Sequence, residues 1–189
     1  MKKGRKMQTK ALPQLDELYK EIILEHYREP KGRVPLERID YKAEGMNPLC
    51  GDEVQLCLQL KDRKIEKVHI EGHGCSISVA SGSMLADILQ GKTIDEAKKL
   101  SKHIKDMMCD KTNVIARSDS DEAIPIDFTE RDRDCFAPNG ARNDRLKLDI
   151  GDLEALEGVK KFPVRIKCAL LPWTTFEEAL VGHEHVEIS

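Results

Sequence analysis

The stretch that decides the fold covers Glu53–Leu85 and reads EVQLCLQLKDRKIEKVHIEGHGCSISVASGSML. Apolar and polar residues alternate in Glu53–Leu60, which is the period of a half-buried β-strand. After a short polar turn, Lys64–Ile70 predicts a second strand, so the two form an antiparallel hairpin or meander. Beyond the glycines that flank His73, the apolar spacing of Ser76–Leu89 predicts a helix.

The same patterns extend outward on both sides of this stretch. Thr93 and Glu96 form the S/T-x-x-E pattern that caps the start of a helix. Proline and glycine mark where helices end. The remaining elements expected are a helix from Leu15 that ends before Pro30, a strand around Ile39–Glu44, a helix that begins at Thr93, a short helix at Asp152–Leu156 and a final helix at Val164–Val181.

The composition excludes several classes of protein. The chain has 189 residues, of which 40% are hydrophobic, and its 31 basic and 34 acidic residues give a net charge of −3. That balance argues against a strongly basic nucleic-acid binder. No apolar stretch approaches the roughly 18 to 20 residues of a membrane-spanning helix, and no apolar segment follows the basic N-terminus as in a signal peptide. We therefore expect a cytoplasmic protein with no nucleic-acid and no membrane partner.

The domain organisation follows from where the periodicity holds. Residues 1–14 are polar and basic, which predicts a disordered tail. Residues 15–189 are expected to form a single domain that is interrupted by an inserted acidic loop at about residues 110–146, where the periodicity fails.

The insertion has a pattern at the level of its codons. Val114–Ala116 can be coded GTC ATT GCG, whose reverse complement encodes the residues found at Arg142–Asp144. Glu122–Ile124 pairs in the same way with Asp134–Phe136, and both pairs are centred on Thr129. We hypothesise that residues 113–144 are a translated palindromic repeat element, the alternative being coincidence in a polar loop. Codons that form no inverted repeat about Thr129 in the gene would contradict this hypothesis.

Three short motifs place a cysteine at the edge of a predicted element: NPLCGD at Asn47–Asp52, GHGCSIS at Gly72–Ser78 and RIKCALLPW at Arg165–Trp173. A helix N-terminus and nearby cations favour the thiolate, which is the form that binds metal and attacks sulfur. Cys75 lies just before the N-terminus of a predicted helix, and Cys168 lies beside the cations Arg165 and Lys167.

A metal site is one interpretation of these motifs. Asp52 follows Cys50 across a glycine, so a tight turn can direct both side chains to one point. With Cys75 and Cys168 they would supply the four ligands of a tetrahedral ion. Since the spacing contains no CxxC pair, small buried cysteines remain the alternative.

The motifs resemble those of the U-type iron–sulfur cluster assembly proteins, which comprise IscU, SufU and the N-terminal domain of NifU. The resemblance includes LYKEIILEHYREPKGR at Leu18–Arg33 and DLEALEGVKKFP at Asp152–Pro163. It is closest to SufU, because Lys167 stands where IscU-type members have a histidine and because extra residues separate the second and third cysteines. The insertion makes this gap longer than the SufU pattern expects, and Gly82 replaces the more usual alanine.

The resemblance implies an α+β fold in which a small antiparallel sheet carries helices on one face. It implies zinc held by Cys50, Asp52, Cys75 and Cys168, and a cysteine desulfurase as partner. Cys50 is the implied acceptor of persulfide sulfur and Cys168 the alternative acceptor. Arg165 is implied to hold Asp52 or an incoming sulfur anion. The chain would then be a zinc-dependent sulfurtransferase.

Two further functions are consistent with the same residues. The chain can instead be a scaffold on which Cys50, Cys75 and Cys168 hold a transient [2Fe–2S] cluster, since such clusters also take thiolates. The scaffold would pass its cluster to the downstream iron–sulfur assembly machinery. The third alternative is a structural zinc module without a transfer function.

Overall fold

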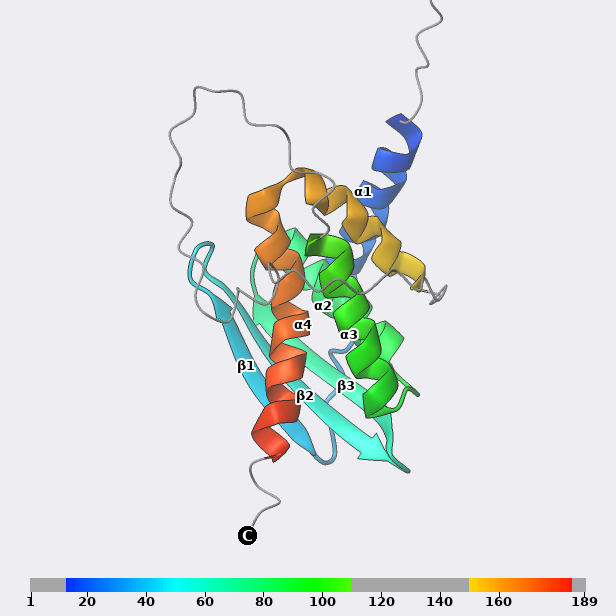
Figure 1. Cartoon of the computed structure of the whole chain (residues 1–189), viewed down its shortest axis with the longest axis vertical. Coiled ribbons are helices and arrows are strands. Elements are labelled where there is room, and N and C mark those ends of the chain that lie inside the picture. The colour runs from blue at the N-terminus through cyan, green and yellow to red at the C-terminus, as the bar shows by residue number, and fades with distance from the viewer. Residues whose placement is uncertain (1–12, 110–149, 185–189) are drawn as a thin grey trace, which may run out of the picture.

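The computed structural model describes residues 13–109 and 150–184 (Figure 1). Within them no helix is both long and apolar enough to cross a membrane. The fold is α+β, as the sequence predicts. In chain order its elements are α1 (Pro13–Arg28), β1 (Tyr41–Asn47), β2 (Asp52–Lys61), β3 (Lys64–His73), α2 (Ser76–Leu89), α3 (Ile94–Cys109), the 3-10 helix η3 (Gly151–Lys161) and α4 (Pro163–Glu184).

The three strands form one antiparallel sheet in the order β1-β2-β3, which confirms the predicted meander. The two residues between β2 and β3, Asp62 and Arg63, have φ values of 51° and 62°. Two successive left-handed residues match the right-handed twist of the strands, as in a tight hairpin. The first strand begins at Tyr41 and lies slightly later than the predicted Ile39–Glu44.

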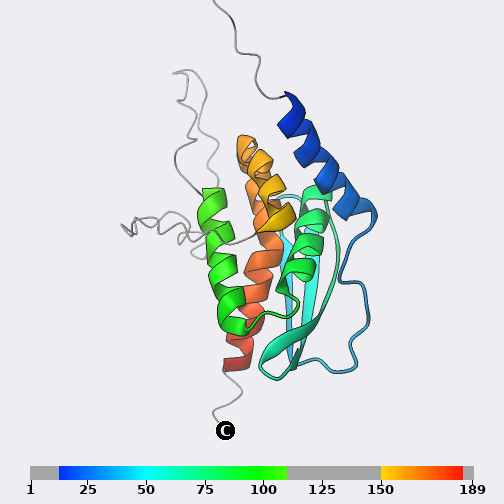
Figure 2. The same cartoon turned by 90° about the vertical axis from the view of Figure 1, so that its right-hand side faces the viewer.

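Of the helices, α2 and α4 pack on the sheet, and α3 lies on the far side of α4 from it (Figure 2). α4 packs on β1 and β2, while α2 packs on β3. Leu56 and Leu58 of β2 and Trp173 and Phe176 of α4 are fully buried where the two elements pack together. The core is therefore mostly aliphatic, with two aromatic rings from the last helix.

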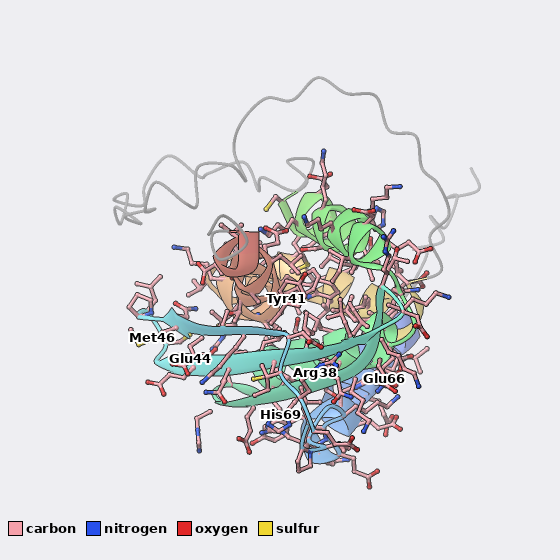
Figure 3. All side chains as sticks on the ribbon, turned by 90° about the horizontal axis from the view of Figure 1, so that it is seen from below. Arg38, Tyr41, Glu44, Met46, Glu66 and His69 are labelled. Atoms are coloured by element: carbon pink, nitrogen blue, oxygen red, sulfur yellow. The ribbon has the colours of Figure 1, made fainter. Side chains whose placement is uncertain are left out.

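The opposite face of the sheet carries polar side chains such as Glu44 and His69 (Figure 3). The segment between α1 and β1 crosses this face, where Nδ1 of His69 donates a hydrogen bond of 2.9 Å to the carbonyl oxygen of Val34. This outer face is the polar face of an antiparallel sheet whose other face packs against the core.

A buried histidine holds α1 against the rest of the domain. His26 is only 5% exposed, and its Nδ1 lies 2.8 Å from Oγ of Ser83 in α2. Its Nε2 lies 3.1 Å from a carboxylate oxygen of Asp152 in η3. The backbone N–H of Lys31 donates to the same Ser83 oxygen, at 2.8 Å. One polar network therefore joins three helices.

Several boundaries differ from the predictions. Pro13 and Gln14 belong to α1, so the predicted tail of residues 1–14 is too long by two residues. The predicted short helix at Asp152–Leu156 is a 3-10 helix of 11 residues. The rest of the tail, and the insertion at about residues 110–146, lie outside the described residues.

The helix starts and ends follow local chemistry. The capping pattern of α3 is confirmed, because the N–H of Glu96 donates to Oγ1 of Thr93 at 3.3 Å and the N–H of Thr93 donates to the Glu96 carboxylate at 2.8 Å. Pro172 lies inside α4, not near its end. A proline there supplies no N–H to the carbonyl four residues earlier, which is that of Cys168.

Candidate metal centre

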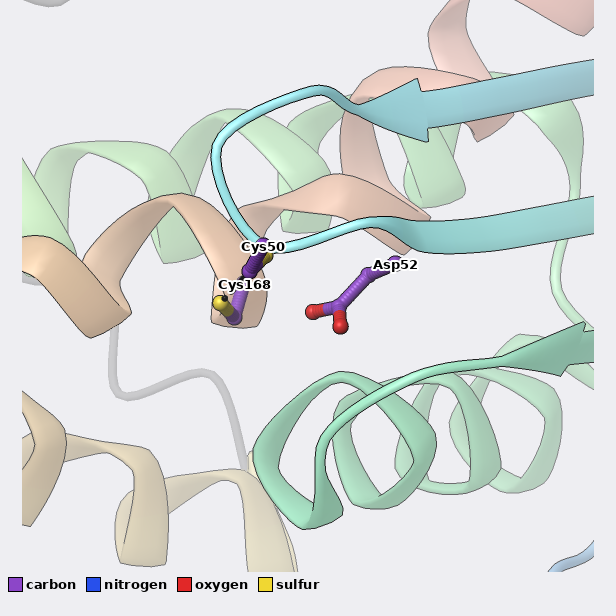
Figure 4. Close-up of side chains that lie close together, drawn as sticks. All are labelled: Cys50, Asp52 and Cys168. Atoms are coloured by element: carbon purple, nitrogen blue, oxygen red, sulfur yellow. Dashed lines mark hydrogen bonds between the residues drawn. The ribbon is translucent and has the colours of Figure 1, made fainter.

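The candidate site lies where the turn between β1 and β2 meets the first turns of α4 (Figure 4). Cys50 comes from the turn, Asp52 begins β2, and Cys168 comes from α4. One ligand atom from each of the three lies within 4.8 Å of the others. The two sulfur atoms are 3.3 Å apart. Residues that are distant in sequence therefore converge on one point.

The turn has a local cause. The carbonyl oxygen of Asn47 accepts hydrogen bonds from the N–H groups of Cys50 (3.3 Å) and Gly51 (2.8 Å). Gly51 has a φ of 69°, a left-handed conformation that a side chain disfavours. The glycine thus lets the chain reverse so that Cys50 and Asp52 face the same point, as the sequence predicts.

The carboxylate of Asp52 is prepared to bind a cation. Asp52 is 2% exposed, and its Oδ1 accepts a hydrogen bond of 2.9 Å from the N–H of Cys75. Its Oδ2 is buried and has no hydrogen-bond partner among the described residues. A buried polar atom without a hydrogen-bond partner destabilises the fold, and a bound ligand would remove that penalty. Two sulfurs and one carboxylate oxygen are donors that zinc accepts.

The charge states of these groups follow from burial and hydrogen bonding. Burial alone would raise the pKa of Asp52, but hydrogen bonding, above all from the Cys75 backbone N–H to Oδ1, outweighs burial and lowers the pKa. Burial raises the pKa of Cys168 well above that of an ordinary thiol, and the hydrogen bond to Cys50 and the negative charge of Asp52 act in the same direction. The metal-free site therefore holds one carboxylate anion and a neutral Cys168.

This result corrects one expectation. The sequence predicts that the neighbouring cations favour the Cys168 thiolate, yet Cys168 is 1% exposed and burial outweighs them. Arg165 is exposed at the start of α4, where the Cys168 sulfur raises the pKa of its guanidinium. A cation that binds at the site must displace the Cys168 proton.

The fourth predicted ligand lies next to this cluster but outside it. Cys75 occupies the N-cap position of α2 and contacts Asp52 through its backbone N–H. Its sulfur is not part of the group within 4.8 Å, whose members are Cys50, Asp52 and Cys168. Among the described residues, the structure therefore assembles three of the four predicted ligands and leaves the Cys75 side chain beside them.

Two further residues shape the site: Gly74, one of the glycines around Cys75 that the sequence predicts to allow close approach of the backbone, and Asn47, which the sequence analysis misses. A Cβ atom on Gly74 would lie 2.9 Å from the carboxylate carbon of Asp52, so the close approach requires glycine. The buried side chain of Asn47 lies against Cys168, with its Nδ2 3.8 Å from the sulfur. Asn-Pro at the start of NPLCGD is a turn signal, but no sequence pattern reveals the contact with the distant Cys168.

The segments that carry Cys50 and Cys168 also carry exposed apolar side chains. Met46 and Leu49, on the Cys50 side, are both 63% exposed. Phe162 and Val164, which precede Cys168, are 60% and 69% exposed. Exposed large apolar side chains close in sequence to Cys50 and Cys168 are candidates for a contact with a partner.

Comparisons with known proteins identify the family of the chain. The family model described as the NifU-like N terminal domain matches residues 18–126. The chain is 35% identical over 170 residues to the zinc-dependent sulfurtransferase SufU of Bacillus subtilis, covering 90% of this chain and 94% of that protein. It is 31% identical over 170 residues to the iron–sulfur cluster assembly scaffold protein IscU of Streptococcus pyogenes, covering 90% and 87%.

A solved structure supports the same fold. A candidate iron–sulfur cluster assembly scaffold protein for the SUF system, from Fervidobacterium islandicum, superposes with a TM-score of 0.61 at 31% sequence identity. The match covers 85% of this chain and 94% of that one.

Proposed function

The chain belongs to the NifU-like N-terminal domain family of iron–sulfur cluster assembly proteins, and from that membership we propose that it is a zinc-bound acceptor of persulfide sulfur. The observation that carries the proposal is the buried, unpartnered Oδ2 of Asp52 beside two cysteine sulfurs. The donor set suits zinc, and a carboxylate among thiolates is a more exchangeable ligand than a further thiolate.

The proposed ligands are Cys50, Asp52 and Cys168, with Cys75 completing the set once its side chain turns toward them. A zinc ion held by these residues would keep the cysteine ligands deprotonated at neutral pH, including Cys168, which burial otherwise holds neutral. The sulfurs of Cys50 and Cys168 lie 3.3 Å apart, so both are close enough to contact one ion.

Cys50 is the proposed sulfur acceptor. Its thiolate attacks the outer sulfur of a partner's persulfide, the S–S bond of that persulfide breaks, and its electron pair leaves on the partner's thiolate. Cys50 then carries the persulfide, with no net oxidation. Cys50 is exposed whereas Cys168 is 1% exposed, which favours Cys50 over the alternative acceptor. Asp52 can shift to release Cys50, and Arg165 can stabilise the incoming sulfur anion.

The proposed partner is a cysteine desulfurase, which presents sulfur as a persulfide. The exposed side chains of Met46, Leu49, Phe162 and Val164 offer an apolar contact around the acceptor. Such a contact excludes water while sulfur is transferred. We place the protein in the cytoplasm, since a sulfur acceptor that works through the thiolate of Cys50 needs a reducing compartment.

The decisive experiment measures sulfide release by the cognate cysteine desulfurase with and without the zinc-loaded protein. We expect faster multiple turnover, and the Cys50→Ala variant should lose the acceleration. Cys57→Ala is the matched control, because Cys57 is buried in β2 outside the cluster and should leave the acceleration unchanged. No acceleration by the unaltered protein would refute the transfer function.

A second function rests on the same cysteines. Cys50, Cys75 and Cys168 can hold a transient [2Fe–2S] cluster with Asp52 as a weaker ligand, and the similarity to a scaffold protein supports this alternative. Reconstitution with iron and sulfide under anaerobic conditions distinguishes the two. A stoichiometric cluster on a protein that does not accelerate the desulfurase would favour the scaffold. A structural zinc module would instead unfold when a chelator removes its metal.

A further inference from the structure

The amide of Asn47 is fixed in one orientation beside the candidate site. Asn47 ends β1 and is 6% exposed. Its Oδ1 accepts a hydrogen bond of 3.1 Å from the backbone N–H of Leu49. Because the amide oxygen points toward the Leu49 N–H, the NH₂ group of the same amide must point the opposite way. That group lies 3.8 Å from the sulfur of Cys168, within the range of a hydrogen bond to sulfur.

This contact distinguishes the two cysteines of the cluster. In the part of the chain that the structure describes, the Asn47 side chain donates to Cys168 and not to Cys50. The main chain of Asn47 meanwhile shapes the turn that carries Cys50, through its carbonyl oxygen. One residue therefore connects Cys50, the exposed cysteine of the turn, with Cys168, which α4 buries.

The chemical consequence concerns nucleophilicity. An N–H group that donates to a metal-bound thiolate withdraws electron density from the sulfur, so the sulfur attacks electrophiles more slowly. We propose that Asn47 is a positioning residue that restrains Cys168 as the static ligand of the metal and thereby leaves Cys50 as the sulfur acceptor. The choice of acceptor rests on the proposed sulfur-transfer function. The contact between Asn47 and Cys168 can be tested without a desulfurase.

The sharpest variants keep the turn and remove the donor. In Asn47→Ser the hydroxyl can still accept the Leu49 N–H in the manner of a Ser/Thr turn, but it is too short to reach Cys168. In Asn47→Asp a carboxylate oxygen accepts the same N–H and supplies no donor. Gln90→Glu, at the exposed end of α2, is the control for an added negative charge.

The first measurement uses the cobalt-substituted protein. Removing the N–H donor should shift the thiolate-to-cobalt charge-transfer absorption to lower energy in both Asn47 variants, because an electron-richer sulfur is easier to oxidise. The Gln90→Glu spectrum should match that of the unaltered protein. Unchanged bands in Asn47→Ser, or a shift only in Asn47→Asp that indicates a new carboxylate ligand, would overturn the proposal. Thermal unfolding confirms that each variant is folded.

The second measurement maps the persulfide by peptide mass spectrometry after one turnover with the desulfurase. The ratio of persulfide on Cys168 to persulfide on Cys50 should rise about tenfold in Asn47→Ser, as expected for the loss of one hydrogen bond to a charged sulfur. An unchanged ratio contradicts the proposal. If the bands shift but the unaltered protein never accepts sulfur, the Asn47 contact stands and the transfer function fails.

Discussion

Replacing Gly74 by alanine tests whether the position of Asp52 controls metal binding. The new Cβ would lie 2.9 Å from both Cγ and Oδ1 of Asp52, about 0.5 Å inside ordinary van der Waals contact. Asp52 is 2% exposed, so its side chain cannot swing into solvent to relieve the overlap. Metal ligands tolerate displacements of about 0.2 Å. The carboxylate should therefore leave its ligand position.

The expected loss follows from that displacement. Disturbing the support of a metal ligand typically lowers affinity about 10- to 100-fold, which is about 1.4 to 2.7 kcal/mol. Competition with a chromophoric chelator measures the zinc affinity of the two proteins. Gly182→Ala is the matched control, because a Cβ at Gly182 meets no described atom within 4 Å. Its zinc affinity should equal that of the unaltered protein.

A double-mutant cycle identifies the cause. If Gly74→Ala acts through Asp52, it should cost little further affinity in an Asp52→Ala background, since mutations that share one contact are not additive. Equal losses in both backgrounds would show that Gly74 acts on another ligand. An unchanged zinc affinity of Gly74→Ala itself would refute the placement of Asp52 at the metal.

Three further predictions concern the metal-free protein. Iodoacetamide should modify the exposed Cys50 well before Cys168, whose pKa is raised by burial, and peptide mapping over time checks the order. The lowered pKa of Asp52 means that its carboxylate stabilises the fold above the ordinary Asp pKa and that this contribution is lost as pH falls through the folded-state pKa. Urea unfolding between about pH 5 and pH 2 should therefore show a steeper loss of stability in the unaltered protein than in Asp52→Asn. Ser83→Ala removes the oxygen that accepts the Lys31 N–H and hydrogen-bonds to His26. The free energy of unfolding should fall by about 1 to 3 kcal/mol. An unchanged urea midpoint would contradict that network.

Local sequence patterns were sufficient for most elements of the fold. The alternation in Glu53–Leu60 and the apolar spacing in Ser76–Leu89 predict β2 and α2 to within a residue. Thr93 and Glu96 predict the start of α3 because a helix cap depends on neighbouring residues alone. The prediction of the short helix after the insertion was less accurate. Its 3-10 geometry depends on how η3 packs on α1 and α4, which local sequence does not show.

The sequence by itself determined the strands, the helix caps and the turn that directs Cys50 and Asp52 to one point, because each depends on residues close together in the chain. Only the tertiary structure decided how Cys168 joins them. Packing of α4 on β1 and β2 buries its thiol, so desolvation outweighs the neighbouring cations that the sequence displays. The same packing brings Asn47 to Cys168, and the approach of β3 to β2 brings Gly74 to Asp52. Such contacts join segments that are distant along the chain, and a local pattern carries no information about the distance between them.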